Sequence, residues 1–168
     1  MKVKEFIKNI LIDEIKDIQQ KCGHHFLSFG LISQGIEFYG ACLDEGSFFE
    51  IGKSGSGFRM AIIELFPSNY HPFAEEKNKP FDLYENLRCG LIHAVLPKAE
   101  LELIQQSEIH RFGNHLEIKS IRKRDRLILV SQILMADFEK AGLEIIRRIE
   151  DREISDDKVY KEFMGIDP

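Results

Sequence analysis

The chain has 168 residues, 43% of them hydrophobic and 30% charged, a mixture that fits one globular domain and excludes a disordered chain. Its formal net charge of −5 excludes nucleic-acid binding by bulk charge, so any nucleic-acid site has to be a local basic patch. The three cysteines, Cys22, Cys42 and Cys89, are widely spaced, which argues against a disulfide framework or a zinc knuckle and fits a reducing compartment.

The N-terminal stretch does not resemble a secretory signal, because Lys8, Asn9 and Asp13 interrupt its apolar residues. No apolar run approaches the roughly 20 residues that a membrane-spanning helix needs. We therefore expect a cytoplasmic protein with one domain over residues 1–168 and no association with a membrane.

Two helices are predicted in the first part of the chain. Apolar residues recur at helical spacing over residues 3–21, and Gly23 is a suitable stop. Residues 25–44 are apolar on two faces, which indicates a second helix that packs against neighbours on both sides. We expect this second helix to end at Gly46.

A third helix is predicted to begin at Ser54 or Ser56, after the loop KSGSG, and to run to Pro67. Residues 67–80 hold three of the five prolines of the chain and are expected to form a surface connection. The stretch GSFFEIGKS resembles a phosphate-binding P-loop, but it has one residue too many between its glycines and no βαβ unit around it. We therefore expect no P-loop.

The next helix contains the sequence YENLRCGLIHAVLP at residues 84–97. Asp82 can cap it, with Glu85 three residues later as in a capping box, and Pro97 ends it. At about 100° per residue, one side is an ordinary core face made of Leu83, Leu87, Leu91 and Ala94. The opposite side is a second apolar strip made of Cys89, Ile92 and Leu96. We expect another chain, or the strands described next, to cover this strip.

After this helix the pattern changes to alternation, which predicts strands at residues 101–104 and 116–121. Gly113 and Asn114 between them are a hairpin signal. Residues 126–130 fit either a third strand or the start of the last helix. The chain is therefore predicted to be mainly α, a helical bundle with a small β-hairpin insertion before its last long helix.

Arg88 and His93 are polar residues in an otherwise apolar run, so they are candidates for chemistry. Arginine binds phosphate through a planar fork of donors and stabilises the charge of a phosphorane transition state. Histidine, which titrates near neutral pH, can take a proton from a ribose 2′-hydroxyl or give one to the leaving oxygen. In a regular helix the two side chains lie about 140° apart, at the two edges of the second apolar strip. If two copies of the chain meet on this strip, a symmetric cleft would hold both pairs.

With four residues between them, Arg88 and His93 match the R-x4-6-H motif, and the chain resembles the HEPN superfamily (higher eukaryotes and prokaryotes nucleotide-binding) over roughly residues 25–150. The resemblance implies a helical bundle, a homodimer with the motif at its interface and often a metal-independent endoribonuclease. Arg88 would then bind the scissile phosphate of RNA, and His93 would be the general acid or base. Many members belong to toxin or defence systems, which implies a cognate antitoxin or another protein as partner. Some members lack activity and serve as binding or dimerisation modules.

The densest basic patch of the chain, within IRKRDR, consists of Arg122, Lys123, Arg124 and Arg126. Such runs are usually solvated turns. This one is also a candidate nucleic-acid-binding patch, because clustered cations attract a phosphate backbone. Nearby, His110 and His115 flank the expected hairpin turn and are expected to be exposed to solvent.

Two other interpretations stay open. The first is a non-catalytic helical dimer or interaction module, in which Arg88 pairs with a buried acid such as Glu64 and His93 is a core histidine. The second is a metal-dependent hydrolase, which needs three converging His or carboxylate ligands. The sequence has no HExxH motif and no tight Asp/His cluster, so we expect neither a metal site nor a cofactor.

Overall fold

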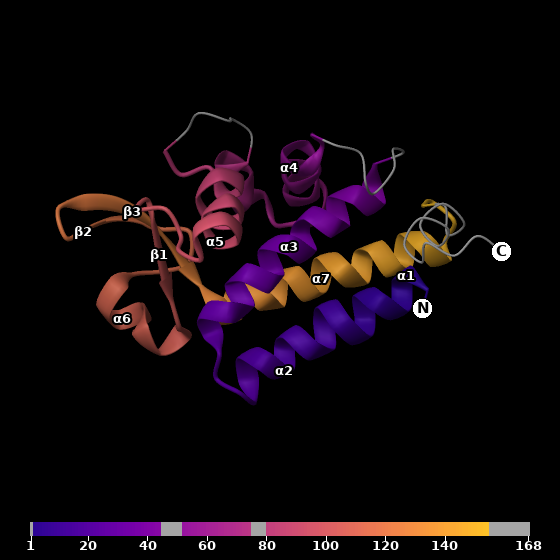
Figure 1. Ribbon diagram of the computed structural model, residues 1–168, viewed down its shortest axis with the longest axis horizontal. Coiled ribbons are helices and arrows are strands. Elements are labelled where there is room, and N and C mark those ends of the chain that lie inside the picture. Colours follow the sequence, from indigo (N-terminus) through magenta and orange to yellow (C-terminus); the bar gives the residue numbers. More distant parts are fainter. Residues whose placement is uncertain (1, 45–51, 75–79, 155–168) are drawn as a thin grey trace.

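The computed structural model describes residues 2–44, 52–74 and 80–154. It is mainly helical, with a small three-stranded sheet before the last long helix, which confirms the predicted fold class (Figure 1). The N-terminal helix runs without a break through α1 (Val3–Glu5), η1 (Phe6–Glu14) and α2 (Ile15–Gln20). The predicted stop after it is confirmed, because Gly23 has a φ of 69°, in the left-handed region that favours glycine.

Three longer helices complete the bundle: α3 (His25–Leu43), α4 (Ser54–Leu65) and α7 (Ser131–Glu150). α3 lies in the middle and contacts α2, α4 and α7, as expected for a helix that is apolar on two faces (Figure 1). It approaches α4 closely at Gly40, where an added Cβ would overlap the carbonyl oxygen of Gly57. Among the described helices, only α3 is long and apolar enough to cross a membrane, and half of it is buried by the rest of the bundle. The predicted end at Gly46 concerns a residue outside the described ranges.

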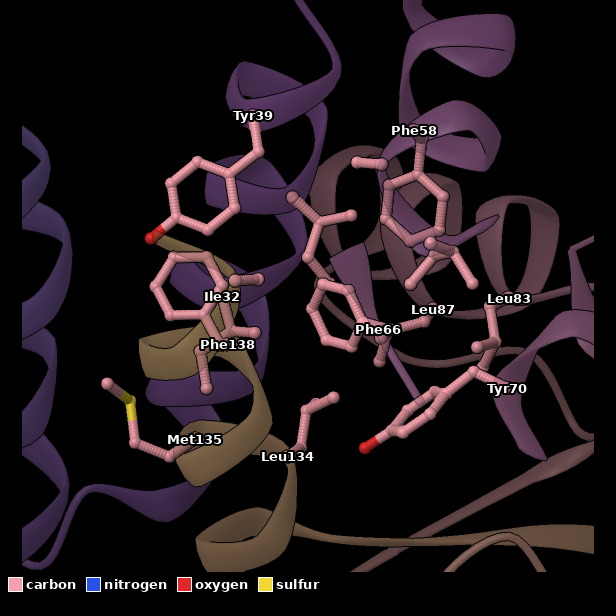
Figure 2. Close-up of a cluster of buried hydrophobic side chains, with 14 of the residues drawn as sticks. Ile32, Tyr39, Phe58, Phe66, Tyr70, Leu83, Leu87, Leu134, Met135 and Phe138 are labelled. Atoms are coloured by element: carbon pink, nitrogen blue, oxygen red, sulfur yellow. The ribbon is translucent and has the colours of Figure 1, made fainter. Parts of the chain in front are cut away.

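Aromatic rings fill the core between α3, α7 and the segments after α4 (Figure 2). Tyr39 of α3 stacks on Phe138 of α7, with their ring centroids 4.7 Å apart. Tyr70, in the 3-10 helix η2 (Ser68–Phe73), is fully buried and packs edge-on against Phe66. The connection after α4, which was expected on the surface, therefore contributes a large side chain to the core.

The sheet differs from the prediction in how its strands pair. It consists of β1 (Leu101–Ile104), β2 (Ile118–Ile121) and β3 (Arg124–Val130), in the order β1-β3-β2. β1 pairs with β3 in parallel, whereas β2 and β3 form the antiparallel hairpin. The predicted hairpin across Gly113 and Asn114 was therefore wrong, because the chain between β1 and β2 folds into η4 (Gln106–Glu108) and α6 (Ile109–Phe112). Gly113, with a φ of 129°, ends α6.

The motif helix consists of η3 (Tyr84–Arg88) followed directly by α5 (Cys89–Ala94). Asp82 caps it as predicted, because its Oδ1 accepts the backbone N–H of Glu85 at 3.0 Å. The η3 turn is π-helical, with the N–H of Cys89 bonded to the carbonyl oxygen of Tyr84. Single π-helical turns inside helices occur frequently at functional sites.

The chain reverses direction at the end of α5, earlier than predicted. Val95 adopts a left-handed conformation with a φ of 57°, so the helix ends at Ala94, and Pro97 follows in the returning segment. At Gly90 an added Cβ would lie 2.8 Å from the carbonyl oxygen of Leu96. A glycine is therefore needed at this position for the returning chain to lie against the helix.

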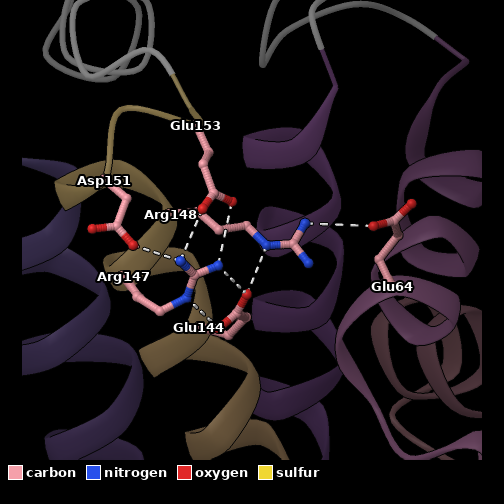
Figure 3. A network of polar contacts seen from close by, with 6 residues as sticks. All are labelled: Glu64, Glu144, Arg147, Arg148, Asp151 and Glu153. Carbon is pink, nitrogen blue, oxygen red and sulfur yellow. Dashed lines mark hydrogen bonds and ion pairs between the residues drawn. The ribbon is translucent and has the colours of Figure 1, made fainter.

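Ion pairs surround the C-terminal end of α7 (Figure 3). Arg147 donates hydrogen bonds to three carboxylates, those of Glu144, Asp151 and Glu153. Arg148 bonds to Glu144 at 2.9 Å and reaches Glu64 of α4 at 3.4 Å. Cations in the last turn also interact favourably with the helix dipole. This network joins the ends of α7 and α4.

Candidate functional site

Arg88 lies at the end of η3, and its side chain pairs with an acid on α3. Its Nε donates a hydrogen bond to Oε2 of Glu37 at 2.6 Å. The other carboxylate oxygen of Glu37 accepts a hydrogen bond from the hydroxyl of Ser54, the first residue of α4. The side chains of Arg88 and Glu37 are 16% and 24% exposed, so the pair is partly buried. Glu64, the acid suggested from the sequence, was the wrong partner, because it lies beside Arg148.

The ring of Tyr84 lies near two guanidinium groups. The Cζ atoms of Arg59 and Arg88 are 5.0 Å and 5.7 Å from the ring centroid, within the range of cation–π attraction. Arg59 is held in turn by Asp82, with 2.7 Å between Nη2 and Oδ2, and Asp82 is fully buried. Burial, followed by the neighbouring thiol of Cys89, raises the pKa of Tyr84. The phenol is therefore neutral at physiological pH.

The ion pair uses only one edge of the Arg88 guanidinium. Among the described residues, only its Nε has a hydrogen-bond partner, and the two Nη groups have none. The planar fork of arginine matches the oxygens of a phosphate or carboxylate. Glu37 therefore fixes the orientation of Arg88 and leaves donors for a further anion.

His93 lies in the last turn of α5 and is exposed to solvent. Within the described ranges its imidazole has no hydrogen bond and no ion pair, and nothing links it to Arg88. Because α5 is α-helical after Arg88, the two side chains point about 140° apart. A single copy of the chain thus places both candidate residues on one short helix without bringing them into contact.

The second apolar strip is only partly covered within one chain. Cys89 and Ile92 are half-buried, whereas Leu96 is 65% exposed. Val95, beside it, is 66% exposed. The end of this strip is therefore open to solvent, next to His93.

The basic patch lies on the β2–β3 hairpin. Arg122 and Lys123 form its turn, and Arg124 begins β3; all three are exposed. Arg126 differs, because its Nη1 bonds to Glu102 of β1 at 2.7 Å and its side chain is 19% exposed. The sequence therefore identified four neighbouring cations, of which three are open to solvent.

A buried polar network was missed by the sequence prediction. His115, expected to be exposed, is mostly buried, and its Nε2 lies 2.7 Å from the hydroxyl of Tyr70. Its Nδ1 accepts the backbone N–H of Val130 at 2.9 Å. The hydroxyl of Tyr70 donates to Oδ2 of Asp137 at 3.0 Å, and Lys140 donates to the other oxygen of the same carboxylate at 3.1 Å.

The directions of these hydrogen bonds define the protonation of His115. Because Nδ1 is an acceptor, the single proton of the neutral ring lies on Nε2, which donates to Tyr70. Burial lowers the pKa of His115 to about 4, against the smaller opposing effect of Asp137. His115 is therefore a neutral link between the loop before β2 and the bundle. No sequence motif predicts this network, because its members are far apart in the chain.

No group of three or more His, Cys, Asp or Glu side chains in the described ranges is arranged to hold a metal ion. Comparison of the chain with protein-family models, with curated proteins and with solved structures finds no match. A proposal about function therefore has to depend on the side chains themselves.

Proposed function

We propose that the protein is a homodimeric, HEPN-like endoribonuclease of the cytoplasm that cleaves RNA without a metal ion. The observation that supports this function is the state of Arg88. Its Nε is bonded to Glu37, and its remaining donors are unused within the described ranges. On the same short helix, His93 is exposed and has no partner there. A guanidinium that binds phosphate and an imidazole that transfers protons are groups that support RNA cleavage without a metal ion.

In the proposed reaction, one His93 takes the proton of a ribose 2′-hydroxyl, and the 2′-oxygen forms a bond to the adjacent phosphorus. The bond from phosphorus to the 5′-oxygen of the next nucleotide breaks, and His93 of the partner subunit gives that oxygen a proton. The products are a 2′,3′-cyclic phosphate and a 5′-hydroxyl. Arg88 binds the non-bridging oxygens and stabilises the charge of the transition state.

A dimer is part of the proposal because one chain supplies one His93, and the acid and the base act at the same time. The exposed side chains of Val95 and Leu96 beside His93 are suitable for a two-fold contact. Full burial of each contributes roughly 1.5–3 kcal/mol. Leu96→Asp would place a charge in this contact while leaving the core of the single chain unchanged. We expect a dimer for the unaltered protein by light scattering and a monomer for this variant.

The decisive experiment is RNA cleavage in EDTA. The unaltered protein should leave 2′,3′-cyclic phosphate ends, and His93→Ala should lose activity by a factor of at least about 100. His24→Ala is the matched control, because His24 is also exposed and its side chain has no described partner. Cleavage that survives in His93→Ala, or that chelation abolishes, would contradict the proposed reaction.

A second candidate function is a non-catalytic dimer or interaction module that binds a protein such as an antitoxin. The partly buried Arg88–Glu37 ion pair favours it, because such a pair also serves to hold the helix in place. In that case Arg88→Ala should unfold the protein or dissociate the dimer. If the protein is a nuclease, by contrast, His93→Ala should lose cleavage at small cost in stability, because His93 is exposed.

A further inference from the structure

Positive charge is concentrated in one short part of the chain. Residues 109–126 contain six Lys and Arg against two Asp and Glu, a net charge of +4. The rest of the chain contains 17 Lys and Arg against 26 Asp and Glu, a net charge of −9. A polyanion is repelled by most of this molecule, so an enzyme that acts on one needs a local attractive surface. Residues 109–126 are the segment that can provide it.

This segment forms α6 and most of the β2–β3 hairpin, at the end of the molecule away from α1 (Figure 1). β2 is an edge strand, and its residues from Ile118 to Ser120 are exposed. Arg122 and Lys123 connect β2 to β3 as a two-residue turn. The turn is therefore the tip of an exposed arm.

The conformation of the tip is costly for its residues. Arg122 and Lys123 have φ angles of 51° and 66°, the left-handed pattern of a type I′ turn. Asn-Gly adopts this turn with little strain, whereas residues with long side chains are disfavoured in it. Arg122 and Lys123 occupy this turn although its backbone conformation favours Asn and Gly. Backbone strain of this kind is concentrated at functional sites.

The free cations lie on a common side of the hairpin as well as at its tip. Lys119 is paired across the ladder with Arg126, and Ile121 with Arg124, so these four side chains share one face. α6 packs on the same face, through Ile109 and Phe112 against the small core that includes Ile121, and it adds the exposed Arg111.

The cations of the hairpin differ in whether an acid neutralises them. Arg126 is bonded to Glu102. Within the described ranges, Lys119, Arg122, Lys123 and Arg124 have no ion pair. These four cations are open to an anionic ligand.

We propose that the β2–β3 hairpin is a binding arm for the phosphate backbone of RNA, with Lys119, Arg122, Lys123 and Arg124 as its contacts. The proposal rests on the proposed function for the choice of RNA over other polyanions. The arm is separate from Arg88 and His93 and would hold the strand without reading its sequence, because cations that contact phosphate give register and affinity only.

The test is binding of a fluorescent 2′-O-methyl RNA, measured by anisotropy at several salt concentrations. This RNA lacks the hydroxyl that cleavage needs, so binding is measured on the intact protein whether or not it is an enzyme. The arm variant combines Arg122→Gln, Lys123→Gln and Arg124→Gln. The control combines Lys4→Gln and Lys8→Gln on the N-terminal helix with Lys21→Gln directly after it, and changes the net charge by the same amount.

A plot of log affinity against log salt has a negative slope, and each lost phosphate contact reduces the size of that slope by about 0.7 for a single strand. Three lost contacts should therefore reduce it by about 2 and weaken binding about 100-fold at 0.1 M salt. The control should bind like the unaltered protein. If the arm variant and the control lose RNA affinity equally, binding depends on the net charge of the protein and not on the arm, and the proposal is overturned. An unaltered protein that binds anionic vesicles or an acidic peptide but not this RNA would also overturn it.

A second variant separates binding from folding. Arg122→Asn with Lys123→Gly installs the preferred type I′ dipeptide, so it should raise the melting temperature while it lowers RNA affinity about 25-fold at 0.1 M salt, the value for two contacts. Unchanged affinity in this variant would overturn the arm. If RNA binding depends on the arm but the protein cleaves no RNA, the binding arm is supported and the proposed nuclease is rejected. If the protein cleaves RNA but the arm variant binds RNA as well as the unaltered protein does, the nuclease is supported and the binding arm is rejected.

Discussion

Asp82 has two structural roles, and substitutions there can separate them. Its Oδ1 caps the motif helix through the N–H of Glu85, and its Oδ2 accepts hydrogen bonds from Nε and Nη2 of Arg59 at 3.2 Å and 2.7 Å. Asp82 is completely buried, and the side chain of Arg59 is only 12% exposed. Asp82→Ala removes the cap and leaves the guanidinium of Arg59 unpaired in a largely buried position.

The expected loss follows from these two roles. Breaking a buried ion pair by removing one partner costs about 3–5 kcal/mol, and losing an N-cap costs about 1 kcal/mol, so Asp82→Ala should lower the free energy of unfolding by about 5 kcal/mol. Asp82→Asn keeps the cap through its one amide oxygen but places an NH2 donor where Oδ2 accepts from Arg59, so its loss should be about 3–4 kcal/mol. Adding Arg59→Leu to Asp82→Asn removes the unpaired charge. This double variant should be at least about 2 kcal/mol more stable than Asp82→Ala.

Urea denaturation followed by circular dichroism measures these differences by linear extrapolation. The order of stability should be the unaltered protein, Asp82→Asn and then Asp82→Ala. A loss below about 1.5 kcal/mol for Asp82→Ala would refute the assignment of a buried ion pair. A double variant as unstable as Asp82→Ala would instead show that Arg59 is needed for its packing near Tyr84 and not for its charge.

Three further outcomes are expected. Tyr39→Phe should raise the melting temperature by about 2–4 °C in a thermal scan, because it removes a buried hydroxyl that has no hydrogen-bond partner among the described residues. The free energy of unfolding should fall by about 3 kcal/mol as the pH drops from 6.5 to 4. Folding lowers the pKa of His115 to about 4, so over this pH range the unfolded chain binds a proton at His115 that the folded chain does not bind. Urea titrations at several pH values check this, and His115→Gln should abolish that part of the pH dependence. Val95→Gly should stabilise the protein by about 1 kcal/mol in the same assay, since Val95 is exposed and has a φ of 57°.

The parts of the fold that the sequence predicted depend on local interactions. The long helices follow from the spacing of apolar residues, and the Asp82 cap is visible because its partner is three residues away. The hairpin was misplaced because Gly113-Asn114 is a strong local turn signal and Arg122-Lys123 is not. The parallel pairing of β1 with β3 also joins segments that no local pattern relates.

The candidate site was predictable only in part, for the same reason. Arg88 and His93 were recognised because both lie in one short motif. Glu37, the partner of Arg88, is 51 residues away and leaves no signal in the sequence near the motif. The His115 network likewise joins the chain before β2 to Tyr70 in η2 and to Asp137 in α7, and such contacts arise only from the tertiary packing.

The positions of Arg88 and His93 make them unequal as tests of function. The motif helix is too short to be stable alone, so its place depends on contacts with other segments. Arg88 supplies one of these contacts through Glu37, and Arg88→Ala therefore removes a structural ion pair together with any catalytic group. His93 is exposed and contributes no described contact, so its substitution changes only the chemistry that it could perform. Loss of cleavage in a folded His93→Ala protein is consequently stronger evidence for the nuclease than the same loss in Arg88→Ala.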